Sequence, residues 1–296
     1  MMLIQNPLIS KFKYIKPNLY GILLSVLFSH SALAGGFSLY TEGSVSELGV
    51  FAAGSAAQAP DPSIGWYNPA GLVLMPEDGI VFSGVGVLPN TSLSGTSTYQ
   101  TTGVPDYIQS FSGLDGARNA VVPALHLAHP LGEKAVLGLS IVSPFGLSTD
   151  WAGDSALRYA GTLTELLTLV VSPEIGGYLN DHLALGVGLD LEWARVTFNA
   201  IAGSPAALQY LQSSGGLVTP TTLDSRSENT GDSFGVGFHA GLLAFFNDER
   251  TRIGFNFQSA VNHRFEGTST LTGRLADPNL DSTTAVYQLD TLSSND

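Results

Sequence analysis

Seven segments of the chain alternate apolar residues with small or polar ones at a period of two. The segment 251–267 shows the pattern most clearly: Ile253, Phe255, Phe257, Val261 and Phe265 share one parity, and small or polar residues fill the other. Successive side chains of a β-strand point to opposite faces, so one face of this segment is apolar. The pattern predicts strands near 79–88, 119–129, 134–145, 165–178, 182–198, 233–246 and 251–267.

The connections between these segments are of two kinds. Short turns rich in Gly, Asn and Asp lie at 130–133, 180–181 and 247–249, whereas long connections span 89–118, 146–164, 199–232 and the residues from 268 onward. Short turns at one end and long extracellular loops at the other are typical of outer-membrane β-barrels. One such strand alone is equally compatible with a soluble β-sandwich.

The parity also predicts which side chains face lipid. Asp190 and Glu192 share one face of their strand, and a carboxylate facing hydrocarbon is very costly, so that face must line the lumen. Tyr178 and Trp193 are either part of an interfacial aromatic girdle or ordinary strand aromatics. The positions expected to face lipid in the four middle strands are Leu137, Leu139, Ile141, Leu167, Leu169, Val171, Ile175, Leu183, Leu185, Val187, Leu189, Leu191, Phe234, Val236, Phe238, Ala240 and Leu242.

Composition agrees with a lipid-facing exterior. Of the 296 residues, 44% are hydrophobic and 12% are charged, where about a quarter charged is usual for soluble domains. No apolar run of about 18 residues lies beyond the N-terminal region, which disfavours a helical membrane protein. Residues 1–34 read as an export signal, with three lysines, an apolar stretch and an Ala32-Leu33-Ala34 cleavage site. Its removal makes the net charge of −13 more negative, which argues against nucleic acid as a partner.

Two further features leave alternatives open. Residues 35–77 are rich in Gly and Ala without strand periodicity, so they form either a compact plug in the lumen or a linker to a periplasmic partner. Pro123, Pro144 and Pro173 fall within or at the ends of three predicted strands, where proline cannot donate to the ladder. Pro144 therefore either ends the strand 134–145 or leaves an unpaired stretch of wall.

Several motifs resemble one known family. They are Gly36-Phe37-Ser38-Leu39, Trp66-Tyr67-Asn68-Pro69-Ala70-Gly71-Leu72, Ser143-Pro144-Phe145-Gly146-Leu147, Arg158-Tyr159, and Gly186-Val187-Gly188 leading to Trp193-Ala194-Arg195. With these motifs the chain resembles the FadL/TodX family of outer-membrane transporters for long-chain fatty acids and hydrocarbons. The resemblance implies a transmembrane antiparallel β-barrel of roughly 14 strands, an N-terminal hatch, ligand capture at extracellular loops, and lateral exit through a kinked third strand.

The resemblance also implies roles for individual residues. Asn68, Pro69 and Ala70 would form the hatch motif. An N-terminal gate would consist of Gly35, Gly36 and Phe37, and the kink of the third strand of Ser143, Pro144, Phe145 and Gly146.

Ligand contacts are expected in the loop 199–232 and at two arginines. Ser204 and Pro205 begin a short predicted helix whose Leu208, Tyr210 and Leu211 would lie against an acyl chain or pack the loop down. Arg195 resembles the arginine of the family that would meet a carboxylate headgroup, although strict alternation turns it outward. Arg264, inward by parity, is the alternative counter-charge.

The predicted organisation is therefore an export signal at 1–34, a hatch at 35–77 and barrel strands in 78–296. Seven strands cannot close an even-numbered barrel. We interpret the chain as the N-terminal half of a larger, all-β barrel, with an eighth strand beginning at 287–292; an intact short protein that closes by oligomerisation is the alternative.

We predict passive transport of hydrophobic compounds, most of all long-chain fatty acids, through a plugged barrel in the outer membrane of a Gram-negative bacterium. The expected partners are these small molecules and outer-membrane lipid, with no cofactor and with a monomeric full-length protein. Aromatic hydrocarbon uptake by the same route is an alternative, as is a structural or adhesive barrel of the phage-receptor type. An enzyme is disfavoured, because the histidines are scattered and no G-x-S-x-G motif occurs.

Overall fold

The computed structural model describes residues 38–248 and 250–295, with side chains up to residue 289. The predicted export signal and the predicted gate of Gly35, Gly36 and Phe37 lie outside the described residues. Among the described residues, the helices are all too short or too polar to span a membrane.

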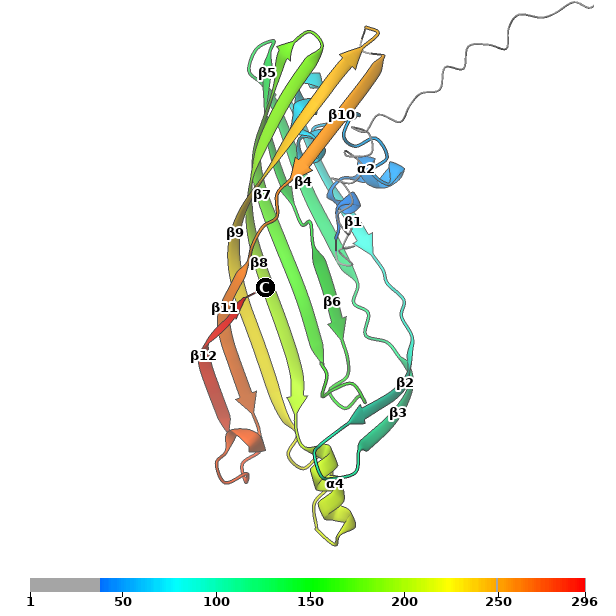
Figure 1. Ribbon diagram of the computed structural model, residues 1–296, viewed down its shortest axis with the longest axis vertical. Coiled ribbons are helices and arrows are strands. Elements are labelled where there is room, and N and C mark those ends of the chain that lie inside the picture. Colours follow the sequence, from blue (N-terminus) through cyan, green and yellow to red (C-terminus); the bar gives the residue numbers. More distant parts are fainter. Residues whose placement is uncertain (1–37, 249, 296) are drawn as a thin grey trace, which may run out of the picture. The chain divides into compact units, whose positions relative to one another are not determined.

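Most of the described chain is antiparallel β-sheet (Figure 1). The strands are β1 (Gly79–Val87), β2 (Leu93–Tyr99), β3 (Tyr107–Leu114), β4 (Ala120–Pro130), β5 (Ala135–Val142), β6 (Gly146–Asp150), β7 (Leu163–Asn180), β8 (Leu183–Ala202), β9 (Ser225–Phe246), β10 (Thr251–Gln258), β11 (Arg264–Thr272) and β12 (Val286–Asn295). Ten of them form one sheet in the order β1-β4-β5-β7-β8-β9-β11-β12, with β6 paired to β7 and β10 to β9. Neighbours in the sheet thus follow the order of the chain, as in an up-and-down barrel wall.

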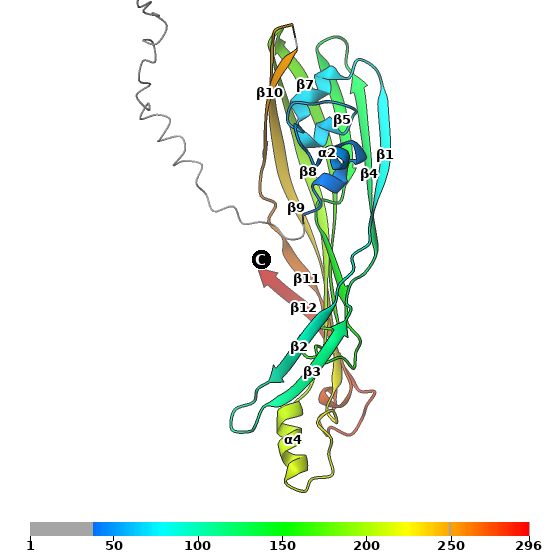
Figure 2. The same ribbon diagram turned by 90° about the vertical axis from the view of Figure 1, so that its right-hand side faces the viewer.

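Short helical turns precede the sheet and cover one of its faces (Figure 2). They are η1 (Thr41–Gly43), α2 (Val45–Val50), α3 (Ile64–Tyr67) and η2 (Pro69–Leu74). Because η2 contacts β5, β7, β8 and β9, we call the covered face the inner face and residues 38–78 the N-terminal segment. Two further helices, α4 (Pro205–Ser213) and η3 (Arg274–Ala276), lie in the long loops.

Burial confirms the predicted faces of the middle strands. In β8, Leu185, Val187 and Leu189 are exposed on the outer face, whereas Asp190 and Glu192 are buried on the inner face. The same alternation runs along β7 and β9. The apolar positions are therefore free to contact lipid, and the polar positions pack against the N-terminal segment.

Both kinds of connection are present as predicted, with one addition. The tight turn after β9 places Asn247 and Asp248 at φ 53° and 54°, which Asn and Asp tolerate better than other residues with a side chain. The connection 89–118, expected to be a loop, contains the hairpin of β2 and β3. Its strands are rich in Ser, Thr and Gly and mostly exposed, so they lack the apolar parity that marks a wall strand.

The segment 251–267 is not one strand, and part of its predicted parity is wrong. Residues 259–263 leave the sheet between β10 and β11. Gln258 lies opposite His239 and Glu266 lies opposite Asp232, so this stretch of chain is one residue longer than the stretch of β9 that it faces. One extra residue exchanges the two faces. Val261 and Phe265 consequently lie on the inner face, and Arg264, predicted to point inward, is exposed on the outer one.

The strand expected to begin at 287–292 is confirmed as β12, which pairs with β11. Within the described residues β1 and β12 are the two ends of the sheet order.

An arginine on the outer face tests the assignment of faces. Leu189→Arg should destabilise the protein in a bilayer by about 2–4 kcal/mol, since the charge would face hydrocarbon, whereas Thr197→Arg, on the same face of the strand beyond Arg195, should cost about 0–1 kcal/mol. Leu189 is exposed and Thr197 half-exposed. Urea titration of folding into lipid vesicles measures both, and equal costs would contradict the assigned lipid band.

Candidate functional site

Three glycines in neighbouring strands form a seat for the Asn68-Pro69 turn. Gly176 of β7 pairs with Gly186 of β8, which pairs with Gly241 of β9. A Cβ at any of the three would come well under 3.0 Å from Pro69 or Asn68. The absence of side chains along this row is therefore what lets the backbone of the N-terminal segment touch the wall.

Asn68 ties this turn to both the segment and the wall. Its side chain is fully buried, and its Nδ2 donates to the carbonyl of Ala56 and to that of Leu242 in β9, the latter at 3.2 Å. Its Oδ1 accepts from the backbone N–H of Ala70 at 3.1 Å, which caps η2, and Pro69 stands at the first position of that helix. The predicted hatch motif of Asn68, Pro69 and Ala70 is thus one compact, fully hydrogen-bonded turn.

A buried group of acids and histidines lies beside this seat. Asp190 Oδ1 is 2.8 Å from His239 Nδ1 and accepts a hydrogen bond of 2.8 Å from Ser172. His239 Nε2 is 3.1 Å from the carbonyl of Gly65 in α3 and 3.9 Å from a carboxylate oxygen of Glu174. Both ring nitrogens of His239 therefore lie within hydrogen-bond distance of oxygen atoms. The described residues contain no cluster of three or more His, Cys, Asp or Glu suited to a metal ion.

The wall is interrupted where the third predicted strand contains Pro144. β5 ends at Val142 and β6 begins at Gly146. Between them, Phe145 donates its N–H to the hydroxyl of Thr168 at 3.0 Å and accepts from it at 2.8 Å, so one side chain replaces the ladder. Of the predicted kink, Ser143, Pro144 and Phe145 thus lie out of the ladder, whereas Gly146 begins β6 and pairs with Leu167.

The first described residues of the chain lie against this interruption. Leu39 donates its N–H to the carbonyl of Pro144 at 2.7 Å, and Ser38 forms a β-bridge with Phe145. A Cβ at Gly146 would lie 2.9 Å from the side chain of Leu39. The N-terminal segment therefore contacts the wall at this interruption as well as at the glycine row.

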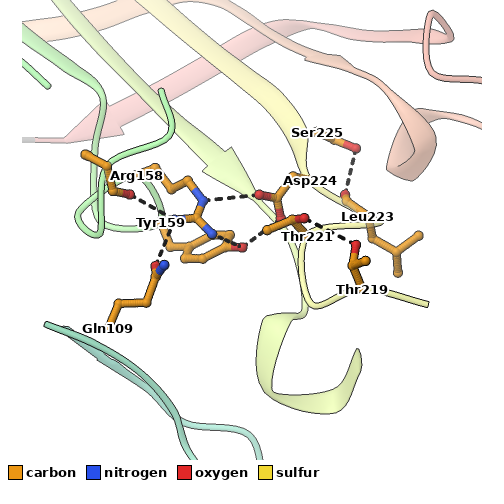
Figure 3. A network of polar contacts seen from close by, with 9 residues as sticks. Gln109, Arg158, Tyr159, Thr219, Thr221, Leu223, Asp224 and Ser225 are labelled. Atoms are coloured by element: carbon orange, nitrogen blue, oxygen red, sulfur yellow. Dashed lines mark hydrogen bonds and ion pairs between the residues drawn. The ribbon is translucent and has the colours of Figure 1, made fainter. Parts of the chain in front are cut away.

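Three long connections are joined by one buried network, shown in Figure 3. Arg158, only 3% exposed, contacts Asp224 through Nε at 3.2 Å and donates through Nη1 to Gln109 of β3 at 2.8 Å. Tyr159 donates to Asp224 at 2.7 Å and accepts from Arg158 Nη2 at 3.0 Å. Burial and the hydrogen bond to Asp224 raise the pKa of Tyr159, so the phenol keeps the proton that it donates. The network fixes the hairpin β2–β3 and the loops 151–162 and 203–224 to one another.

The predicted ligand contacts fall into two groups. In α4, Leu208 is buried, whereas Tyr210 and Leu211 are half exposed. Arg195 lies on the outer face beside Trp193 and is paired with Asp232 at 2.8 Å. Arg264 is exposed as well, so neither arginine is brought to the N-terminal segment.

Sequence reasoning missed three parts of this site. Predicting the glycine row requires the register between strands, although the sequence already shows that small residues share one face of each strand. Arg158-Tyr159 was noted as a motif without a role, because its partner Asp224 is 66 residues away. The hydrogen bond between Asp190 and His239 likewise joins residues far apart in the sequence, one in β8 and one in β9.

Comparisons with known proteins agree on one family. The family model described as "Outer membrane protein transport protein (OMPP1/FadL/TodX)" matches residues 25–292. A long-chain fatty acid transport protein of Escherichia coli O6:H1 is 30% identical over 250 residues, covering 81% of this chain and 54% of that protein. A 47 kDa outer membrane protein of Pasteurella multocida is 30% identical over 238 residues, covering 80% and 52%.

Solved structures show a similar fold. A Pseudomonas aeruginosa FadL homologue superposes with a TM-score of 0.58 at 19% identity, over 74% of this chain and 52% of that one. A mutant of the TodX monoaromatic hydrocarbon channel gives a TM-score of 0.50 at 17% identity, over 80% and 58%. The chain spans about half the length of the curated relatives that it matches.

A methyl group in the glycine row tests the seat. Gly186→Ala should lower the free energy of unfolding by about 1–3 kcal/mol, because the new Cβ collides with the backbone of Pro69. Gly177→Ala is the matched control, since its Cβ would make an ordinary contact of 3.5 Å. Urea unfolding of the two variants in detergent or lipid measures the two free energies. Equal stabilities would mean that the Asn68-Pro69 turn does not pack against the glycine row.

Breaking the loop network should loosen the long loops. Arg158→Gln leaves Asp224 without its charge partner, and removing one member of a buried pair costs about 3–5 kcal/mol. Arg118→Gln removes an exposed pair with Asp150, which costs about 0–1 kcal/mol. We expect protease added to intact cells to cleave loops 151–162 and 203–224 faster in the first variant only. Unchanged cleavage in both would argue against the network as the loop anchor.

Proposed function

The chain belongs to the OMPP1/FadL/TodX family of outer membrane transport proteins, and we propose that it carries hydrophobic compounds, long-chain fatty acids first, passively across the outer membrane. Members of this family are transporters or channels. Aromatic hydrocarbons are the second candidate substrate, since one structural relative is a monoaromatic hydrocarbon channel.

One observation carries the route of this proposal. The start of the N-terminal segment, at Ser38 and Leu39, lies on the interruption of the wall at Pro144 and Phe145. In the proposed mechanism, ligand arriving in the lumen displaces this start, which uncovers the interruption from inside. The ligand then leaves sideways between β4 and β6, past the exposed ring of Phe145, into the outer-membrane lipid.

The rest of the N-terminal segment serves as a fixed hatch in this proposal. Asn68 and Pro69 hold it on the glycine row, and the Asp190–His239 pair holds α3 through Gly65. Polar solutes are thereby kept out while a ligand path opens near Ser38.

Capture takes place at the long loops in the same proposal. The Arg158 network positions the hairpin β2–β3 and the loop that carries α4, and Tyr210 and Leu211 offer exposed apolar surface there. Arg195 and Arg264 are not assigned to a headgroup, because both lie on the outer face.

Deleting Ser143 tests transport and route together. Between Val142 and Gly146 the chain has one residue more than β7 has between the residues that pair with them. The deletion removes this residue, so that the ladder can continue from β5 into β6 and close the interruption. Uptake of labelled oleate by cells that make the protein should fall to that of cells lacking the gene. Deletion of Gly103, in the turn between β2 and β3, is the control and should leave uptake unchanged.

The outcomes separate the two claims. Oleate uptake that is the same with and without the intact gene would remove long-chain fatty acids as the substrate. Normal uptake after loss of Ser143, with the variant folded in the outer membrane, would remove only the exit route.

A further inference from the structure

We propose that the wall has a second lateral opening, at Ser259–His263 between β10 and β11, which passes uncharged apolar molecules. The proposal rests on the proposed transport function and adds a route to it. It concerns the edge of β9 that pairs with β10 and β11, whereas the interruption at Pro144 lies between β5 and β6 (Figure 1).

The ladder along this edge of β9 has a gap. β10 pairs with β9 as far as His239, and β11 pairs with it from Asp232 onward, so residues 233–238 stand outside both pairings. On its other edge, β9 pairs with β8 continuously from Ser225 to Ala244. The gap is therefore a local feature of one edge.

The gap is built like the interruption at Pro144. Each inserts one extra residue relative to the neighbouring strand, since β5 pairs Val142 with Val170 while β6 resumes with Gly146 opposite Leu167. Each also satisfies backbone groups with hydroxyls. Thr168 serves Phe145 in the first, whereas in the second Ser233 accepts from the N–H of Arg264 at 3.0 Å and Ser259 from that of Phe238 at 2.9 Å.

The two interruptions lie on one row of the sheet. Thr168 of β7 pairs with Ala194 of β8, which pairs with Ser233 of β9. The hydroxyls that terminate the two ladders are thus two strands apart and at the same register. The same construction therefore recurs in the same row of the wall.

Val261 closes the second interruption from inside. The chain 259–263 lies over the inner face of β9, where a Cβ at Gly237 would be 2.7 Å from one methyl of Val261, and a Cβ at Gly235 would collide with the other. Because both wall residues are glycines, Val261 fills most of the space that two wall side chains would otherwise occupy, together with Ser259 Oγ at Gly237 and with the carbonyl of Asn262 and the imidazole of His263 at Gly235. Displacing the segment 259–263 leaves room along the edge of β9.

The surroundings select the class of molecule. The outer face of the gap carries Phe234, Val236 and Phe238, whose exposed fractions are 63%, 55% and 50%, so it is apolar where it meets lipid. On the inner face, the buried carboxylate of Glu192 lies 3.5 Å from the imidazole of His263. A carboxylate headgroup would have to share the imidazole of His263 with Glu192 there. An uncharged molecule of the size of toluene needs no such partner.

A disulfide lock tests the opening, because the chain has no cysteine of its own. In the protein carrying Val261→Cys and Gly237→Cys, a Cβ at position 237 would lie 2.7 Å from the place of a γ-methyl of Val261, close enough for a disulfide to form. The lock is placed in the variant lacking Ser143, where the first interruption is closed. We expect labelled toluene uptake to persist in the reduced form, to fall on oxidation to the level of cells without the gene, and to return on reduction.

Two controls accompany the lock. Val187→Cys with Ala240→Cys ties β8 to β9 at an unbroken, outward-facing pair and should not change toluene uptake. Val261→Cys with Gly235→Cys repeats the lock, should the first pair fail to reach the outer membrane.

Each outcome decides between the claims. Toluene uptake that is insensitive to oxidation, or is already lost without Ser143, overturns the second opening and leaves the transport proposal standing. Oleate uptake without toluene uptake by the intact protein also overturns it. If neither compound is taken up, the transport proposal fails and the second opening with it.

Discussion

The pairing of backbone amides and carbonyls is the constraint on which the rest of this structure depends. In hydrocarbon an unpaired peptide group costs several kcal/mol, so a wall in a membrane must be a continuous ladder. β8 and β9 meet this demand over their whole common length. Where the ladder stops, at Phe145 and at Ser259 and Arg264, serine and threonine hydroxyls take over the hydrogen bonds. An interruption is thus possible only where a hydroxyl stands at the right register.

A second constraint is how closely the N-terminal segment packs against the wall. The N-terminal segment presses its backbone against the wall, and this is possible only where the wall has no side chain. Gly176, Gly186 and Gly241 meet the turn at Asn68, and Gly254 of β10 meets the carbonyl of Ala56. These glycines on the inner face of the strands therefore each contact a particular residue of the N-terminal segment. The same principle lets Val261 lie over Gly235 and Gly237.

Much of the fold could be predicted, because its main signal is local. A period of two identifies a strand and its faces without knowledge of any partner, which is why Asp190 and Glu192 were placed inward. A change of face inside a strand carries a weaker signal. In Ser259-Ala260-Val261-Asn262-His263 the alternation fails, since Ser259 and His263 are polar on the parity of Phe257, but this failure alone does not give the register in which the strand resumes. The extra residue that turns Phe265 inward and Arg264 outward became visible only in the pairing to β9.

The N-terminal segment is held very unevenly, and this decides which part of it can move. Around Asn68 and Pro69 it is fully buried, capped, and in contact with β5, β7, β8 and β9. At Ser38 and Leu39 it is held by one backbone hydrogen bond and one isolated bridge. Regions with few buried contacts open at a small fraction of the free energy of global unfolding. Release at Leu39 therefore costs far less than release at Asn68, so the interruption at Pro144 can be uncovered while the turn at Asn68 stays in place. The proposed barrier to polar solutes and the proposed path for apolar ones are compatible in one segment for this reason.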